Sequence, residues 1–294
     1  MSQDSYSERE GASPSDPSRR DFVALSAAAG LAASSGVVRG AEMKIVEEDV
    51  TITTPDGSCD AAFIHPASGA HPGVLVWTDV FGLRPSMRAI AKRMAEEGYS
   101  VLVPNPFYRT SKAPQFPDAS TFDFAANRAQ LAPLTGPLNK EGAADTDAKA
   151  YIAWLDSQKA VDKKKKIGTQ GYCMGGPLVV RTAAAVPNRV GAGGSFHGGG
   201  LVSDQPTSPH LLAPKINAHM YFAVASNDDQ RQPDAKDKLN EAFGSKAEVE
   251  VYSTCLHGWC VSDMPLQNGN PIYNKPEADR AWTKLVALYK ANLV

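Results

Sequence analysis

Gly171-Tyr172-Cys173-Met174-Gly175-Gly176 is the stretch of sequence that decides the fold. The alternation of strands and helices along the chain predicts a strand over residues 167–170, and Pro177 is predicted to open the helix that follows, where its missing N–H costs nothing. Glycines on both sides of Cys173 let the chain turn sharply, so that this residue stands exposed above a sheet in a strained conformation. The pattern is typical of a nucleophile elbow. The alternative is a small buried cysteine in an ordinary glycine-rich turn.

Strands and helices alternate on both sides of this elbow. Apolar runs and helical spacing predict strands at residues 73–77, 100–104, 219–225 and 249–252, and helices at residues 87–98, 144–155, 234–243 and 277–292. Turn residues at 54–57, between apolar residues at 44–52 and 61–65, predict a hairpin at the sheet edge. Regular alternation of this kind indicates a mostly parallel, doubly wound α/β sheet flanked by helices.

Residues 105–142 interrupt the alternation. They are irregular and rich in proline and aromatic residues, and they are far longer than the usual connection of about two to six residues in such folds. Long insertions of this kind act as lids or binding loops. We therefore expect this segment to shape the site above Cys173.

The first 41 residues differ in character from the rest of the chain. Residues 1–17 are almost free of apolar side chains and are expected to form a disordered tail, whereas residues 22–38 carry no charge and follow the pair Arg19-Arg20. This layout resembles a twin-arginine export signal, which predicts a periplasmic protein and a single domain over residues 42–294. The alternatives are a cytoplasmic protein with an alanine-rich first helix, or a membrane anchor, which interruptions by serine and glycine disfavour. The mature protein is thus not expected to insert stably into a membrane.

Composition narrows the classes of partner. Hydrophobic residues make up 43% of the 294 residues and charged residues 21%, as in a globular protein with an ordinary core. Thirty Lys and Arg residues against thirty-two Asp and Glu residues give a net charge of −2, which offers no field for nucleic acid, and the lysine run at residues 163–166 is expected to be a solvated loop. The expected partner is a small molecule. The sequence does not indicate the oligomeric state.

Four cysteines are too few for a disulfide scaffold, and their spacing contains no paired zinc-ligand motif, so no metal is expected. Cys255 and Cys260 flank His257. They could form a disulfide in an oxidising compartment or remain two free thiols.

An acid and a base follow the elbow in the order that this fold uses. Asp228 and Asp229 come just after the strand at 219–225, and His257 comes just after the strand at 249–252. His257 is the candidate base for Cys173, and an aspartate would fix its tautomer. His197 follows an earlier strand; it could line the site or be a hydrogen-bonded structural histidine.

Together these motifs resemble the dienelactone hydrolase family of α/β-hydrolases, over nearly all of the chain from Lys44 to the end. The motifs that carry the resemblance are residues 77–83 (WTDVFGL), residues 98–99, residues 104–109 (PNPFYR), the cysteine elbow, and the late aspartate and histidine.

The resemblance implies a Cys-His-Asp triad, with Asp228 preferred over Asp229, and an oxyanion hole formed by the N–H groups of Met174 and Val80. It also implies Arg109 as the arginine that binds a substrate carboxylate. Asp79 stands where the family commonly has a glutamate that holds the resting thiol, and it is one methylene shorter. The aromatic residues expected either to line an apolar pocket or to be plain core are Phe81, Tyr108 and Trp259.

The implied activity is hydrolysis of an enol-lactone or a related activated ester, with no metal or organic cofactor. A thiol nucleophile requires a good leaving group, and an enolate qualifies. In the expected mechanism Cys173 attacks, a thioester forms with release of the enolate, and water activated by His257 completes the reaction. The expected substrate is a small ester or lactone, anionic if Arg109 binds it. The alternatives are a broader carboxylesterase or thioesterase, or a non-catalytic binding protein on the same fold.

Overall fold

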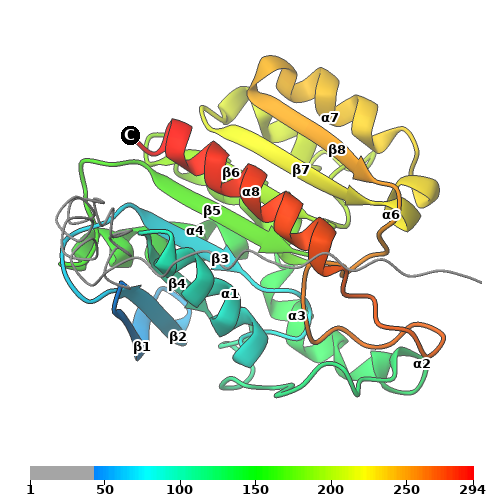
Figure 1. Cartoon of the computed structure of the whole chain (residues 1–294), viewed down its shortest axis with the longest axis horizontal. Helices are drawn as coiled ribbons and strands as arrows, with labels where there is room; N and C mark the ends of the chain where they lie inside the picture. Colours follow the sequence, from blue (N-terminus) through cyan, green and yellow to red (C-terminus); the bar gives the residue numbers. More distant parts are fainter. Residues whose placement is uncertain (1–42) are drawn as a thin grey trace, which may run out of the picture. The chain divides into compact units, whose positions relative to one another are not determined.

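The computed structural model describes residues 43–294, and these contain one eight-stranded sheet with helices on both faces (Figure 1). The strands are β1 (Ile45–Thr54), β2 (Gly57–Pro66), β3 (Gly73–Trp77), β4 (Ser100–Pro104), β5 (Ile167–Tyr172), β6 (Val190–Phe196), β7 (His219–Ala225) and β8 (Ala247–Tyr252). Their order in the sheet is β1-β2-β4-β3-β5-β6-β7-β8. The tail and export signal predicted for residues 1–41 lie outside the described residues.

The strand directions confirm the predicted mostly parallel sheet. β1 and β2 form an antiparallel hairpin, and β2 also pairs antiparallel with β4. From β4 to β8 every neighbouring pair is parallel. Because parallel strands end at the same edge, the loops that follow β3, β5, β6, β7 and β8 meet there, and this edge is where ligands bind in open α/β sheets.

Different helices cover the two faces of the sheet. The helices α1 (Pro85–Glu96) and α8 (Lys275–Asn292) pack on one face, and α4 (Ala143–Ser157), α5 (Gly175–Ala185) and α7 (Ala235–Phe243) pack on the other. The strand β3 is buried along its whole length. Its Val74 and Val76 face α1, whereas Leu75 and Trp77 face the side of α4 and α5. A strand buried on both faces reads as a continuous apolar run, which is why the sequence predicts it well.

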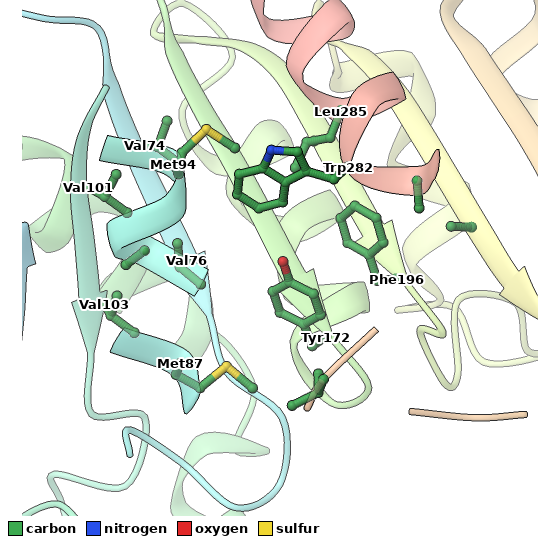
Figure 2. Packing of buried hydrophobic residues seen from close by; sticks show 14 of the residues in the cluster. Val74, Val76, Met87, Met94, Val101, Val103, Tyr172, Phe196, Trp282 and Leu285 are labelled. Carbon is green, nitrogen blue, oxygen red and sulfur yellow. The ribbon is translucent and has the colours of Figure 1, made fainter. Parts of the chain in front are cut away.

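The core beneath α1 and α8 reaches the residues that precede the functional loops. Figure 2 shows Met87 and Met94 from α1 and Trp282 and Leu285 from α8, packed around the valines of the central strands and the rings of Tyr172 and Phe196. The last two rings are stacked with their centroids 5.1 Å apart. They directly precede Cys173 and His197, so close packing fixes the chain where it enters the site.

Three local differences separate the structure from the sequence prediction. The helix α5 begins at Gly175, so Pro177 is its third residue and not its first, although its missing N–H still falls in the first turn. Residues 105–142 contain short helices: α2 (Phe124–Asn127), η1 (Arg128–Gln130) and α3 (Ala132–Leu138). A short helix α6 (Ser226–Arg231), which the sequence did not predict, carries both candidate aspartates. Two further 3-10 segments, η2 (Pro209–Lys215) and η3 (Gly244–Lys246), complete the described chain.

Within residues 43–294, no helix combines the length and the apolar character needed to cross a membrane.

Candidate active site

Cys173 lies at the turn between β5 and α5 with a positive φ of 51°, a strained backbone conformation for a residue with a side chain. The neighbouring glycines make this turn possible. A Cβ atom on Gly171 would lie 2.2 Å from the carbonyl oxygen of Gly175, and one on Gly175 would lie 2.5 Å from the carbonyl oxygen of Trp77. Both are backbone atoms that cannot move away easily, so the elbow requires glycine at both positions.

Backbone hydrogen bonds tie the elbow to β6. The N–H of Cys173 donates to the carbonyl oxygen of Phe196 at 3.0 Å and also to Nδ1 of His197 at 3.2 Å. The carbonyl oxygen of Cys173 accepts from Gly176 at 3.0 Å. Cys173 is thereby held in the lining of a cavity, two residues before the start of α5.

The structure brings His257 and Asp228 together beside Cys173. Nδ1 of His257 lies 2.6 Å from Oδ2 of Asp228, and His257 and Cys173 line the same cavity. The N–H of His257 donates to Oδ1 of Asn227 at 2.8 Å, which fixes the histidine loop to α6. Asp229 points elsewhere, because its Oδ1 accepts from Nζ of Lys236 at 2.7 Å. Of the two candidate aspartates, only Asp228 contacts the histidine.

The charge state of His257 follows from these contacts. Burial lowers its pKa, but hydrogen bonds to Asp228 and Cys173, together with the negative charges of those groups, more than offset burial and raise the pKa to about 10. His257 is therefore an imidazolium at neutral pH in the resting site, with its charge matched by Asp228.

In the described part of the chain, two backbone amides of the cavity wall lie beside Cys173 and are free to donate. Val80 and Met174 both line the cavity beside Cys173. Among residues 43–294, neither of their N–H groups donates a hydrogen bond. Free amide donors next to a nucleophile can stabilise the negative oxygen of a tetrahedral intermediate.

Asp79 does not hold the thiol, contrary to what its position in the sequence suggested. Its Oδ1 accepts from Nη1 of Arg84 at 2.7 Å and from the N–H of Phe81 at 2.9 Å, and its Oδ2 accepts from Nη2 of Arg84 at 2.9 Å. No hydrogen bond joins Asp79 to Cys173 in the part of the chain that the structure describes. Both carboxylate oxygens are already engaged, and the shorter side chain stays with the arginine.

Arg84 is a functional candidate that the sequence analysis missed. It is fully buried and also donates from Nε and Nη2 to the two oxygens of Asp263, each at 2.8 Å. Asp79 precedes the amide of Val80, and Asp263 follows His257 by six residues. Burial lowers the pKa of Arg84, but the two carboxylates more than reverse this shift and keep the guanidinium charged. One buried cation thus links the loop of the candidate oxyanion hole to the loop of the candidate base.

The cavity has a volume of about 640 Å³. Phe81 lies on its wall and packs edge-on against Phe122, with the ring centroids 5.1 Å apart. The other lining residues beyond those described above come mainly from residues 124–139 and 264–272: Phe124, Leu131, Thr135, Asn139, Gly199, Arg231, Met264, Pro265, Leu266, Gln267 and Ile272. The insertion at residues 105–142 therefore does contribute to the site, as the sequence analysis expected of it.

Arg109 is not positioned to bind a substrate carboxylate. It does not line the cavity; it donates to Asp147 through Nη1 and Nη2, each at 2.8 Å, and to Asp56 through Nε at 2.9 Å. Tyr108 is also wrongly predicted as a pocket residue, because its hydroxyl donates to Asp147 at 2.8 Å away from the cavity. Asp56 and Asp147 neutralise the arginine, and because Asp147 belongs to α4, the ion pair joins the loop after β4 to that helix.

His197 and Trp259 lie behind the site and not in its lining. Both are fully buried, and the His197 ring meets the His257 ring edge-on with the centroids 4.7 Å apart. Trp259 stacks on Tyr252 with the ring centroids 4.8 Å apart and meets His197 edge-on at 5.4 Å. Burial, together with the nearby charge of His257, holds the pKa of His197 well below its usual range. His197 is therefore neutral.

The cysteines near the histidine loop are not bridged. All four cysteines of the chain, including Cys255 and Cys260, are free thiols in the structure. Among residues 43–294, no cluster of three or more His, Cys, Asp or Glu side chains is arranged to hold a metal ion.

Comparison with known proteins identifies the family and the fold. The family model described as "Dienelactone hydrolase family" matches residues 59–293. A carboxymethylenebutenolidase from Rhodococcus opacus is 27% identical over 209 residues, which cover 69% of this chain and 77% of the relative. A crystal structure from Klebsiella pneumoniae, provisionally named a dienelactone hydrolase, aligns with a TM-score of 0.70 and 20% identity over 84% of this chain and 99% of the other. The dienelactone hydrolase structure from Anabaena variabilis aligns with a TM-score of 0.56 and 16% identity over 85% and 99% of the two chains.

Proposed function

Since the chain belongs to the dienelactone hydrolase family and is thus a hydrolase acting on esters or lactones, we propose that Cys173, His257 and Asp228 form its catalytic triad. The proposed reaction is hydrolysis of an activated carboxylic ester, such as an enol-lactone, through a thioester. The observation that carries the proposal is the 2.6 Å contact between Nδ1 of His257 and Oδ2 of Asp228, beside the strained Cys173 in one cavity.

In the acylation step the Cys173 thiolate attacks the carbonyl carbon and forms a C–S bond, while the carbonyl electrons move to the oxygen. The N–H groups of Val80 and Met174 stabilise that negative oxygen. Collapse of the tetrahedral intermediate breaks the bond to the alcohol or enolate, which takes a proton from the His257 imidazolium. A thiolate is itself a good leaving group, so the forward reaction requires a substrate whose departing group is also good.

In the deacylation step water hydrolyses the thioester. Cys173 is one of the groups that raise the pKa of His257, so acylation of the sulfur lowers that pKa and makes the neutral imidazole available as a base. His257 then takes a proton from water, hydroxide adds to the thioester carbon, and collapse releases the carboxylic acid and restores the thiolate. The chain's own residues suffice for each proton transfer in this scheme.

A broader carboxylesterase or thioesterase is the second candidate. The specific observation in its favour is the size and mostly apolar lining of the cavity, together with the placement of Arg109 outside it. Both candidates use the same triad and differ in the substrate that they accept.

The test compares single variants on an activated aryl ester. We expect Cys173→Ala and His257→Ala each to lower kcat by at least about a thousandfold, and Asp228→Asn to lower it by about a hundredfold or more. Asp229→Asn is the matched control, because it removes the same charge one residue away and should change kcat by less than about twofold. Retention of activity in Cys173→Ala would mean that the protein hydrolyses esters by another route or only binds them.

We further propose that residues 1–41 contain a disordered tail and a twin-arginine export signal for the domain that follows. The pair Arg19-Arg20 ahead of the uncharged residues 22–38 supports this. Expression of the full chain, with cell fractionation, tests it: the double variant Arg19→Lys, Arg20→Lys should remain in the cytoplasm while the native chain reaches the periplasm.

A further inference from the structure

The cavity above Cys173 presents an apolar wall built from two segments that are far apart in the sequence. Phe124 and Leu131 come from the insertion after β4, and Met264, Leu266 and Ile272 come from the connection between β8 and α8. A volume of about 640 Å³ falls in the range of pockets that enclose drug-sized ligands.

Two residues of this wall are exposed to solvent in the free protein. Phe124 keeps 43% of its surface exposed and Leu266 keeps 57%, whereas large hydrophobic residues elsewhere in the described chain are mostly buried. Phe124 is held in place, since its ring contacts those of Phe81 and Phe122 with centroids 5.6 Å and 5.0 Å away. Ordered apolar side chains that line a cavity and face water are typical of a surface that a ligand covers.

The charges around the cavity do not favour an anionic ligand. Arg231 is the only lysine or arginine among the residues that line it. Its Nη1 lies 3.3 Å from Oδ1 of Asp228, so its charge is directed at the acid that supports His257. Asp79, the one carboxylate among the residues that line the cavity, is neutralised by Arg84.

Three other polar side chains of the wall are uncharged. Thr135, Asn139 and Gln267 offer a hydroxyl and two amides, which can bind an ester or ether oxygen without requiring a charge on the ligand. A carboxylate placed here would lose its hydration, and the two cations that line the cavity, Arg231 and His257, already pair with Asp228.

On the basis of the proposed function, we infer that this enzyme prefers uncharged esters that carry a bulky apolar group, and that Phe124 and Leu266 contact that group. Burying apolar surface against these side chains lowers the free energy of the bound ester and of its transition state alike. The preference should therefore appear in kcat/KM, which grows with the apolar size of the substrate.

The first measurement is a substrate series with the native enzyme. p-Nitrophenyl acetate, valerate and octanoate vary the apolar acyl group with one leaving group, and mono-p-nitrophenyl glutarate matches valerate in length but ends in a carboxylate. Phenyl acetate and 2-naphthyl acetate vary the alcohol side with similar leaving groups. Full burial of a methylene is worth about fourfold, so we expect a gain of at least about tenfold from acetate to octanoate or from phenyl to naphthyl acetate. We also expect valerate to exceed the glutarate monoester by about tenfold or more.

The second measurement assigns the preference to the wall. Phe124→Ala and Leu266→Ala should each lower the ratio of kcat/KM for the favoured bulky ester to that for p-nitrophenyl acetate by about fivefold. Leu211→Ala is the matched control, because Leu211 is 52% exposed but does not line the cavity, and it should leave both values unchanged. Circular dichroism and thermal melts of each variant establish that it is folded.

Two results would overturn the inference. One is a flat profile in both series. The other is a preference for the glutarate monoester, above all one that Arg231→Gln removes selectively while the ratio of octanoate to acetate is kept. The triad proposal is judged separately: if Cys173→Ala abolishes hydrolysis of p-nitrophenyl acetate while the profile is flat, the substrate inference alone fails.

Discussion

The Nδ1 atom of His197 accepts a hydrogen bond from the backbone N–H of Cys173, at 3.2 Å. The ring proton of this neutral histidine therefore sits on Nε2, which is buried and has no hydrogen-bond partner within the described chain. An unsatisfied donor of this kind costs stability, so the ring is retained here for its contacts with the elbow and with His257.

Replacing His197 should separate activity from stability. His197→Phe removes the acceptor but keeps an aromatic ring against His257, and we expect kcat/KM to fall about tenfold while the free energy of unfolding changes by less than about 1 kcal/mol. His197→Asn keeps an acceptor and should lose less activity. Ester hydrolysis and urea unfolding measure the two effects. Equal losses in both variants would show that the hydrogen bond to Cys173 is not the cause.

The raised pKa of His257 makes the folded state less stable as the pH rises. The folded state binds the histidine proton more tightly than the unfolded chain does, so this stabilisation is complete below about pH 6.5 and is lost as pH rises through about 10. Asp228→Asn removes one cause of the shift, and we expect it to lower the free energy of unfolding by roughly 1–3 kcal/mol at pH 7 and by little at pH 10. Urea midpoints of both proteins between these pH values test this, and a pH-independent difference would contradict it.

Arg84 should be the more critical of two neighbouring arginines. Arg84→Met leaves Asp79 and Asp263 without their buried cation, and we expect a loss of about 3–5 kcal/mol in the free energy of unfolding together with lower kcat. Arg88→Met is the control, because Arg88 pairs with Glu47 and Asp49 nearer the surface and should cost less than about 1 kcal/mol. Thermal and urea unfolding distinguish the two, and similar losses in both variants would contradict a special role for Arg84.

Replacing Arg109 should lower the stability of the fold without changing the enzyme's selectivity between charged and uncharged esters. Arg109→Met leaves Asp147, a fully buried acid, without its bidentate partner, and we expect a loss of about 2–4 kcal/mol in the free energy of unfolding. The ratio of kcat/KM for mono-p-nitrophenyl glutarate to that for p-nitrophenyl valerate should change by less than about twofold. A selective loss of the charged ester would instead return Arg109 to the binding site.

The strands of the sheet could be predicted from the sequence because each strand is marked by the residues within it. The run at residues 73–77 is apolar at every position, and the structure buries all of it as β3. The order of Cys173, Asp228 and His257 along the chain also follows from the fold, since each comes after a parallel strand. Periodicity and chain order suffice for such features.

The pairing of charges could not be predicted, because it depends on contacts between distant residues. Arg84 meets Asp263 across 179 positions, and Arg109 meets Asp147 across 38. The choice between Asp228 and Asp229 depends on α6, in which successive side chains diverge by about 100°, so that one acid reaches His257 and the other Lys236. Nothing local in the sequence marks that short helix.

The two segments that supply Phe124 and Leu266 contribute no strand to the sheet. Neither segment touches Gly171 or Gly175, the two glycines that make the Cys173 turn possible. Selectivity and folding are therefore encoded in separable parts of the chain. A mutant library confined to residues 124–139 and 264–272 can explore new substrates at little risk to the nucleophile. This separation makes the protein a practical starting scaffold for directed evolution of thiol-dependent esterases.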